Sequence, residues 1–197
     1  MRKISVLAVL SALIAGCTNQ GMSPPITHLL VLTDLSTPEE QAYATSFHDQ
    51  LARKARRYQT ASFDRFSADA TVVDYSGIPS RDVVEEIIFH RLQETVPSTD
   101  KALLAGAHRI SSQANNLPDG ERLTAVILTS GTRDPATIEA LTEIISTVPT
   151  SGSTTIYLAG VNAENVSALT PVFHTIPANA AVVGTLDADL KTLLRRL

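Results

Sequence analysis

Apolar residues follow two different spacings along this chain, and the two alternate. Short continuous apolar runs predict buried strands, and the clearest of them cover residues 28–33, 123–131 and 154–161. Between them, apolar positions recur every three or four residues, which is the spacing of helices with one buried face. Continuous strands that alternate with such helices are typical of a parallel sheet covered on both faces. We therefore expect an α/β fold with a doubly wound, mostly parallel, six-stranded sheet.

Two local signals add detail to this outline. Residues 61–77 hold two short strand-like runs with a tight connection, which predicts an antiparallel pair. The first helix has a strong start, because Thr37 can cap it, Pro38 suits its first position and Glu40 lies three residues past the cap. The apolar spacing predicts that this helix continues as far as Tyr58.

The N-terminal pattern differs from the rest of the chain. Arg2-Lys3 precedes an apolar run over residues 4–15 that is too short to span a bilayer but suits a signal peptide. The run ends in Ile14-Ala15-Gly16-Cys17, which resembles the lipobox of bacterial lipoproteins. The resemblance implies that residues 1–17 are a lipoprotein signal peptide and that Cys17 carries the lipid. An ordinary secretory signal is the alternative.

The residues around Cys17 support and extend this interpretation. Cys17 is the only cysteine, so the chain can form neither an internal disulfide nor a thiolate metal cluster. Residues 18–26 are mostly small, polar or proline and predict a tether, followed by a domain over residues 27–197. In the lipoprotein family that this segment resembles, an aspartate after the cysteine typically retains the protein at the inner membrane, and this chain has Thr18 at that position. We therefore expect a location in the cell envelope, lipid-anchored at the periplasmic face of the outer membrane.

The composition limits the number of domains and the classes of partner, but it does not indicate a function. The chain has 197 residues, 44% of them hydrophobic, and a net charge of −4, which suits one globular domain. Lysine and arginine form no long block, so we expect no nucleic-acid partner. A short basic cluster, Arg53, Lys54, Arg56 and Arg57, is explained either as a solvated helix end or as a contact with anionic lipid head groups.

Polar side chains follow two of the predicted strands. Asp34 and Ser36 come directly after the first strand, and Ser130 ends the strand that begins at Leu123. If these strands are neighbours, their carboxyl ends bring the three residues together at a topological switch point. A loop that contains Thr99 can close over the same point. Carboxylate and hydroxyl oxygens predict a site for a hard cation, either Mg²⁺ or the related Mn²⁺ and Ca²⁺.

The same residues resemble the von Willebrand factor A family. The segment DLSTP at 34–38 is similar to that family's Asp-x-Ser-x-Ser motif. FDRFSADATVVDY, STDKALLAGAHRI and VILTSGTRD are similar to its next strands, its threonine loop and its fourth strand, in the same order. The resemblance implies a Rossmann-like fold and a metal-ion-dependent adhesion site with Asp34, Ser36 and Thr99 among its ligands.

Two positions depart from the family's motif. Pro38 replaces its second serine, which is explained by helix capping. Ser130 replaces its second aspartate and removes a formal negative charge, which we expect to weaken metal affinity by a factor on the order of 10³. A site in which hydroxyls only cap helices and Asp34 only accepts backbone amides is therefore an alternative to a working metal site.

The sequence predicts no catalysis. It has no nucleophile elbow, no phosphate-binding loop signature and no histidine pair with zinc spacing. We expect a lipid-anchored protein of the cell envelope that binds a protein partner through the loops around Asp34 and is not an enzyme. A flavodoxin-like or hydrolase-like domain that binds a small phosphorylated ligand at residues 130–133 is one alternative, and a scaffold without an open site is another.

Overall fold

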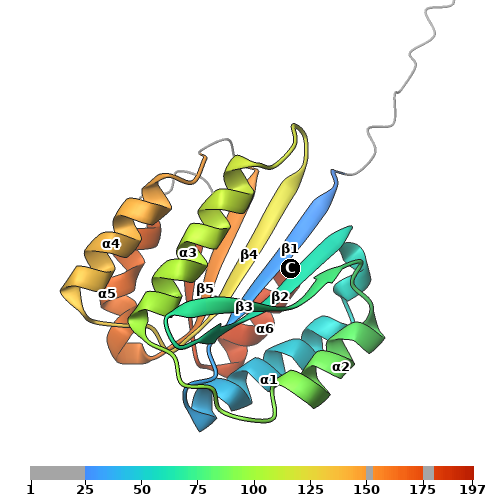
Figure 1. The fold of residues 1–197 in the computed structure, drawn as a ribbon, viewed down its shortest axis with the longest axis horizontal. Helices are drawn as coiled ribbons and strands as arrows, with labels where there is room; N and C mark the ends of the chain where they lie inside the picture. Colours follow the sequence, from blue (N-terminus) through green and yellow to red (C-terminus); the bar gives the residue numbers. More distant parts are fainter. Residues whose placement is uncertain (1–24, 150–152, 175–179) are drawn as a thin grey trace, which may run out of the picture.

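The computed structural model describes residues 25–149, 153–174 and 180–197, and its order of elements matches the predicted alternation (Figure 1). The predicted signal peptide, Cys17 and most of the tether lie outside the described residues. None of the helices in the described ranges is long and apolar enough to cross a membrane.

Six strands form one sheet in the order β3-β2-β1-β4-β5-β6, with only β3 antiparallel to its neighbour. This confirms the predicted fold class and the antiparallel pair. The first and fourth strands are neighbours, so the carboxyl ends that the sequence analysis placed together do meet. The strands are β1 (Thr27–Thr33), β2 (Thr60–Ser67), β3 (Ala70–Gly77), β4 (Arg122–Leu128), β5 (Thr154–Val161) and β6 (Ala180–Gly184).

Helices cover both faces of this sheet, as Figure 1 shows. Side chains alternate along β1, so Leu30 and Leu32 enter one core while Leu29 and Val31 enter the other. The first core packs against α3 (Asp100–Asn115), α4 (Pro135–Ser146) and α5 (Ala163–His174), and the second against α1 (Pro38–Ala52), α2 (Arg81–Arg91) and α6 (Asp187–Arg196). Among the described residues, both cores are built from residues between 29 and 197.

The first helix starts as predicted and ends earlier than predicted. Thr37 caps α1, and Glu40 completes the capping box. The helix ends at Ala52, a 3₁₀ turn η1 (Ala55–Arg57) follows, and Tyr58 is extended. The chain leaves the helix there because it must enter the sheet: the amide of Gln59 already donates to the carbonyl of Thr27 at 2.9 Å. The apolar spacing continues through Tyr58 because the ring of that residue is buried, although its backbone is no longer helical.

Candidate functional site

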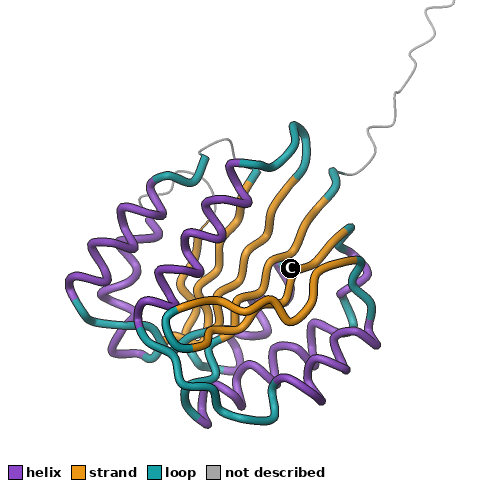
Figure 2. Tube along the Cα trace, viewed as in Figure 1, coloured by secondary structure: helices purple, strands orange, loops and turns teal. Residues whose placement is uncertain are grey.

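The candidate site lies at the edge of the sheet where β1 and β4 end, and several loops gather there (Figure 2). The pairing of the two strands extends one residue past β1, because the amide of Asp34 donates to the carbonyl of Leu128 at 2.8 Å. This bond fixes the backbone of Asp34 at the switch point between the two halves of the sheet.

A second loop is attached to the same edge by backbone hydrogen bonds. The amide of Val96 donates to the carbonyl of Leu35 at 2.9 Å, and the amide of Ala68 donates to the carbonyl of Pro97 at 2.9 Å. Ala68 turns the chain between β2 and β3 with a positive φ of 49°. Together these contacts hold Ser98 over the end of β1.

The Asp34 carboxylate is 9% exposed and accepts hydrogen bonds on both oxygens. Its Oδ1 accepts the Ser36 amide at 3.1 Å, the Ser36 hydroxyl at 2.7 Å and the Ser98 hydroxyl at 2.9 Å. Its Oδ2 accepts the hydroxyl of Thr129, the first residue after β4, at 3.2 Å. Three segments distant in sequence therefore place hydroxyls around one carboxylate.

A second buried carboxylate, Glu40, adjoins this cluster and is 7% exposed. Its Oε2 accepts the Thr37 amide at 3.0 Å and lies 2.8 Å from the Ser36 hydroxyl, while its Oε1 accepts the Ser130 amide at 3.0 Å. Burial alone would raise the pKa of Glu40, but hydrogen bonds from Ser130, Ser36 and Thr37 outweigh burial and lower it. Glu40 is therefore an anion at neutral pH.

The Ser36 hydroxyl lies between the two carboxylates, 2.7 Å from Asp34 and 2.8 Å from Glu40. A hydroxyl carries one proton, so it can donate to only one of them at a time. Neither carboxylate lies within 4.0 Å of a lysine, arginine or histidine nitrogen in the described part of the chain. Among the described residues, the partners of these two carboxylates are therefore hydroxyls and amides.

This donor set fits a hard cation by its chemistry. Mg²⁺ and Ca²⁺ bind oxygen ligands and prefer carboxylates. Within the described ranges, no three residues drawn from histidine, cysteine, aspartate and glutamate cluster as a metal site, so hydroxyls would have to complete the coordination. The oxygens that could do so belong to Asp34, Ser36, Glu40, Ser98 and Thr129.

The four residues predicted as metal ligands are placed differently from one another. Asp34 and Ser36, which the resemblance implied to be metal ligands, lie together and are hydrogen bonded. Ser130 lies beside Glu40 and donates its backbone amide to that residue. Thr99 caps α3, and its hydroxyl lies 2.7 Å from Asp69, an exposed acid, so Ser98 supplies the hydroxyl bonded to Asp34.

Three residues of this cluster were missed in the sequence. Glu40 was interpreted only as the capping-box residue of α1, although a carboxylate at that position must lie within one turn of Ser36. Ser98 precedes Thr99 and was passed over in favour of the position in the family's motif. Thr129 precedes Ser130 in the same way. The strand pattern predicted the correct loops, and besides the expected Ser36 the hydroxyls that contact Asp34 belong to neighbours of the expected residues.

A pocket of about 180 Å³ opens beside Glu40. Tyr43, Ser130, Gly160 and Asn162 line it together with Glu40. Gly160 has a φ of +81°, and a Cβ atom there would lie 3.0 Å from the ring of Tyr43. The volume is that of a few water molecules or one side chain. The cluster is therefore reachable from solvent on the Glu40 side.

Comparisons with known proteins show the fold. No protein-family model matches this sequence, and no curated protein matches it. Two solved structures resemble it with a TM-score of 0.55 and 10% identity: the pilus adhesin SpaC from Lactobacillus rhamnosus GG in an open conformation, and the conserved hypothetical protein BatB from Bacteroides thetaiotaomicron. The similarity covers 89% and 86% of this chain. It spans 30% of the adhesin chain and 96% of the BatB chain.

Proposed function

We propose that this protein is a lipid-anchored domain of the cell envelope that binds a protein partner through a divalent cation at the carboxyl edge of its sheet. The observation that carries the proposal is the pair of buried carboxylates, Asp34 and Glu40, that share one serine hydroxyl and have no cationic side chain beside them in the described ranges. The fold, which resembles that of a pilus adhesin, is compatible with this role.

Glu40 changes the electrostatic argument made from the sequence. Ser130 stands where the resembled family has its second aspartate, and the loss of that charge was expected to weaken the site. In the structure the Glu40 carboxylate lies on the Ser130 side of Ser36, bonded to the amide of Ser130. Two formal negative charges therefore remain. Because hard cations are held chiefly by anionic oxygen, this arrangement favours a working site over hydroxyls that only cap helices.

The residues of this chain would hold the cation, and the partner would complete its coordination. Asp34 and Glu40 would supply charge, and rotation of the Ser36 and Ser98 hydroxyls would turn their lone pairs toward the ion. A bound divalent cation supplies an attachment point for an acidic side chain of the partner. We assign no catalytic step to the site, and the domain is proposed not to be an enzyme.

A phosphorylated ligand at residues 130–133 is less well supported. The Ser130 amide is bonded to Glu40, and the Gly131 amide to the Thr129 hydroxyl. The guanidinium of Arg133 donates to the carbonyl of Glu164 at 3.0 and 2.5 Å. The amides and the cation that a phosphate needs are engaged elsewhere, and two buried carboxylates nearby would repel an anion.

The proposal is tested by titrating residues 18–197 with Mg²⁺ and Mn²⁺ in a calorimeter. We expect binding in the wild type and at least tenfold weaker binding in Asp34→Asn and in Glu40→Gln. Each change removes one of the two carboxylate charges that would attract the cation. Asp69→Asn is the matched control, since it removes an exposed carboxylate near the same edge and should leave affinity unchanged.

Two results would overturn the metal site. One is an absence of heat at millimolar metal, and the other is binding that survives in both Asp34→Asn and Glu40→Gln. Circular dichroism of each variant shows whether it is folded, so that a lost fold is not counted as a lost ligand. Lipid attachment is tested separately by mass spectrometry of the mature full-length protein and of its Cys17→Ser variant.

A further inference from the structure

Basic side chains gather at the opposite end of the domain from the candidate site, where the strands begin. We call this set the basic pole. Its members are exposed or partly exposed arginines and a lysine at the end of α1, in η1, at the start of β4 and at the end of α6: Arg53, Lys54, Arg56, Arg57, Arg122, Arg195 and Arg196.

Backbone contacts place the basic pole around the point where the N-terminal segment joins the domain. The amide of Arg122 donates to the carbonyl of Ile26 at 2.8 Å, on one side of the chain. On the other side, the amide of Gln59 donates to Thr27 at 2.9 Å, two residues after Arg57. The end of α6 adjoins η1, because the Tyr58 hydroxyl donates to the carbonyl of Leu197 at 3.0 Å.

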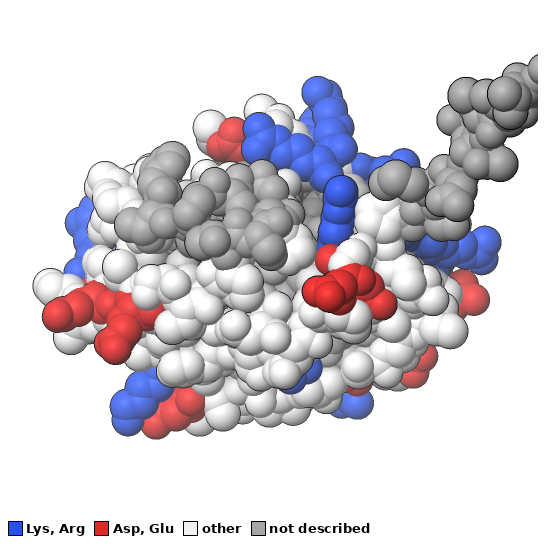
Figure 3. All heavy atoms as spheres, turned by 90° about the horizontal axis from the view of Figure 1, so that it is seen from above, with Lys and Arg blue, Asp and Glu red and all other residues white. Residues whose placement is uncertain are grey.

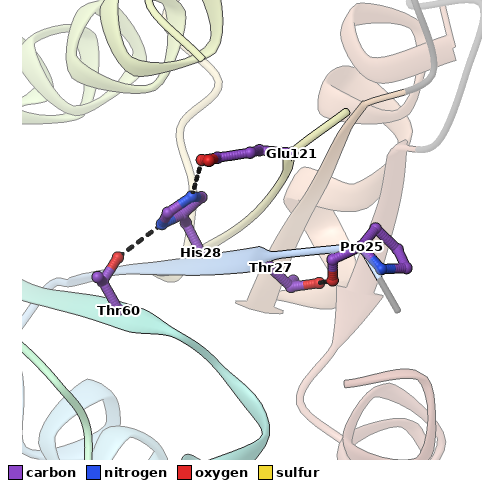
Figure 4. Close-up of polar contacts among 5 residues, drawn as sticks. All are labelled: Pro25, Thr27, His28, Thr60 and Glu121. Atoms are coloured by element: carbon purple, nitrogen blue, oxygen red, sulfur yellow. Dashed lines mark hydrogen bonds and ion pairs between the residues drawn. The ribbon is translucent and has the colours of Figure 1, made fainter. Parts of the chain in front are cut away.

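The side chain of His28 holds the same region together, as Figure 4 shows. Its Nδ1 lies 2.6 Å from the Thr60 hydroxyl and its Nε2 lies 2.5 Å from a carboxylate oxygen of Glu121. The starts of β1 and β2 and the turn before β4 are therefore joined by one imidazole. Only Arg122 of the basic pole belongs to a strand, and the other members lie at the ends of α1 and α6 and in η1, next to these joined strand starts.

The cations of the basic pole are not neutralised by neighbouring acids. Within the described residues, none of its seven members lies within 4.0 Å of a carboxylate oxygen. Burial lowers the pKa of Lys54, and the nearby charge of Arg57 lowers it further. Figure 3 views the domain from this end and shows several Lys and Arg side chains, with fewer acidic side chains among them.

Helix dipoles account for only part of this arrangement. Cations at the ends of α1 and α6 interact favourably with the carbonyls there, which explains Arg53, Arg195 and Arg196. Arg122 is the first residue of a strand, so no dipole favours it. The chain as a whole has a net charge of −4, so the excess of positive charge at this end is local.

We propose that the basic pole is a docking surface for the anionic head groups of a phospholipid bilayer. It surrounds Ile26 and Thr27, where the predicted tether meets β1, and its guanidinium groups, which have no ion-pair partner among the described residues, suit phosphate oxygens. The nine residue steps from Cys17 to Ile26 can span at most roughly 30 Å, so a lipid anchor would keep the basic pole near the bilayer surface. Docking there would direct Asp34 and Glu40 away from the membrane.

The test uses residues 18–197 without lipid, because an anchor would hide the contribution of the basic pole. The protein is sedimented with vesicles of phosphatidylcholine alone or of phosphatidylcholine mixed with phosphatidylglycerol. We expect binding only to the mixed vesicles and a decrease with added salt. Each arginine removed should lower the partition coefficient about fivefold, so Arg56→Gln with Arg57→Gln should lower it roughly 30-fold.

The matched control is Lys101→Gln with Arg133→Gln, which removes the same charge at the opposite end of the sheet and should retain wild-type binding. Equal binding to neutral and mixed vesicles would overturn the proposal, and so would a control that loses as much as the Arg56 and Arg57 variant. Such a failure is independent of the metal titration. A domain that binds Mg²⁺ but not anionic vesicles would retain the proposed function and lose only this inference.

Discussion

Two clusters of buried carboxylates lie close to neighbouring strands of this sheet, one on β2 and one between the end of β1 and the start of α1, and their charges are balanced differently. Asp64 on β2 is 2% exposed, forms an ion pair with Arg109 of α3 and accepts the Ser62 hydroxyl at 2.7 Å. Asp34 and Glu40, at the end of β1, have hydroxyl and amide partners but no cationic side chain among the described residues. One cluster has a cation of its own, although burial still raises the pKa of Asp64, and the other has none among the described residues.

The difference distinguishes a charge that the fold pairs with a cation from charges that the proposed cation would balance. A buried ion pair is closed to outside ligands, because guanidinium and carboxylate satisfy each other. Carboxylates that share one proton from a serine are held by dipoles alone and would gain from an external cation. Mutations at the two clusters should therefore change different measured quantities. Changes at Asp64 or Arg109 should affect folding, and changes at Asp34 or Glu40 should affect ligand binding.

The largest effect is expected for Arg109→Met. This change leaves Asp64 buried without its cation, which typically costs about 3–5 kcal/mol. Urea unfolding at pH 7 measures the loss directly. The double variant Asp64→Leu with Arg109→Met should recover most of it, because an apolar pair replaces the ion pair without an orphaned charge. The single variant should still bind Mg²⁺ under conditions in which it is folded.

A single variant that loses less than about 1 kcal/mol would contradict the structural role of this pair, because such a cost is typical of an exposed ion pair. Arg81→Met is the reference for that case, since Arg81 pairs with Glu85 on the exposed surface of α2.

A smaller effect is expected in acid, where the buried side chain of His48 should change the free energy of unfolding independently of the carboxylates. His48 is 1% exposed, and burial lowers its pKa to about 4. Below pH 6.5 the unfolded chain binds a proton that the folded protein does not bind until about pH 4. The free energy of unfolding should therefore fall by up to about 3 kcal/mol as the pH falls through this window. His48→Leu should remove that fall.

Glu40 responds to acid in the same direction but in a lower range. Its pKa is lowered in the folded protein, so its contribution to stability is present above its unfolded pKa of 4.5 and is lost as the pH falls through the folded value. In the His48→Leu background, Glu40→Gln should flatten the remaining loss below pH 4.5. Unchanged curves for both variants would show that neither group is held as described.

Much of the fold could be predicted from the sequence because its signals are local. The continuous apolar strands, the antiparallel pair and the start of α1 at Pro38 all follow from residue spacing and capping chemistry. The end of α1 could not be predicted in this way. The burial of Tyr58 continues the helical spacing, but the backbone there is drawn into the sheet by the bond between Gln59 and Thr27.

The candidate site was predictable to the level of loops and not of side chains. The strand order and the positions of strand ends indicated where Asp34 and Ser130 would lie. Which oxygen contacts Asp34 depends on long-range contacts, such as the bond between Ala68 and Pro97 that orients Ser98. A family motif transferred by position selects Thr99 instead, one residue away. Side-chain direction reverses between adjacent extended residues, so an error of one residue matters.

That one-residue difference gives the finest test of the comparison. Ser98→Ala removes a hydroxyl 2.9 Å from Asp34 and should lower the affinity for Mg²⁺ several-fold with little change in the free energy of unfolding. Thr99→Ala removes the cap of α3 and should cost about 1 kcal/mol in unfolding free energy while leaving Mg²⁺ affinity near that of the wild type. Paired calorimetry and urea unfolding measure both quantities. If Thr99→Ala lowered the affinity for Mg²⁺ and Ser98→Ala did not, the ligand implied by the family resemblance would be correct. The Ser98 hydroxyl would then only orient Asp34.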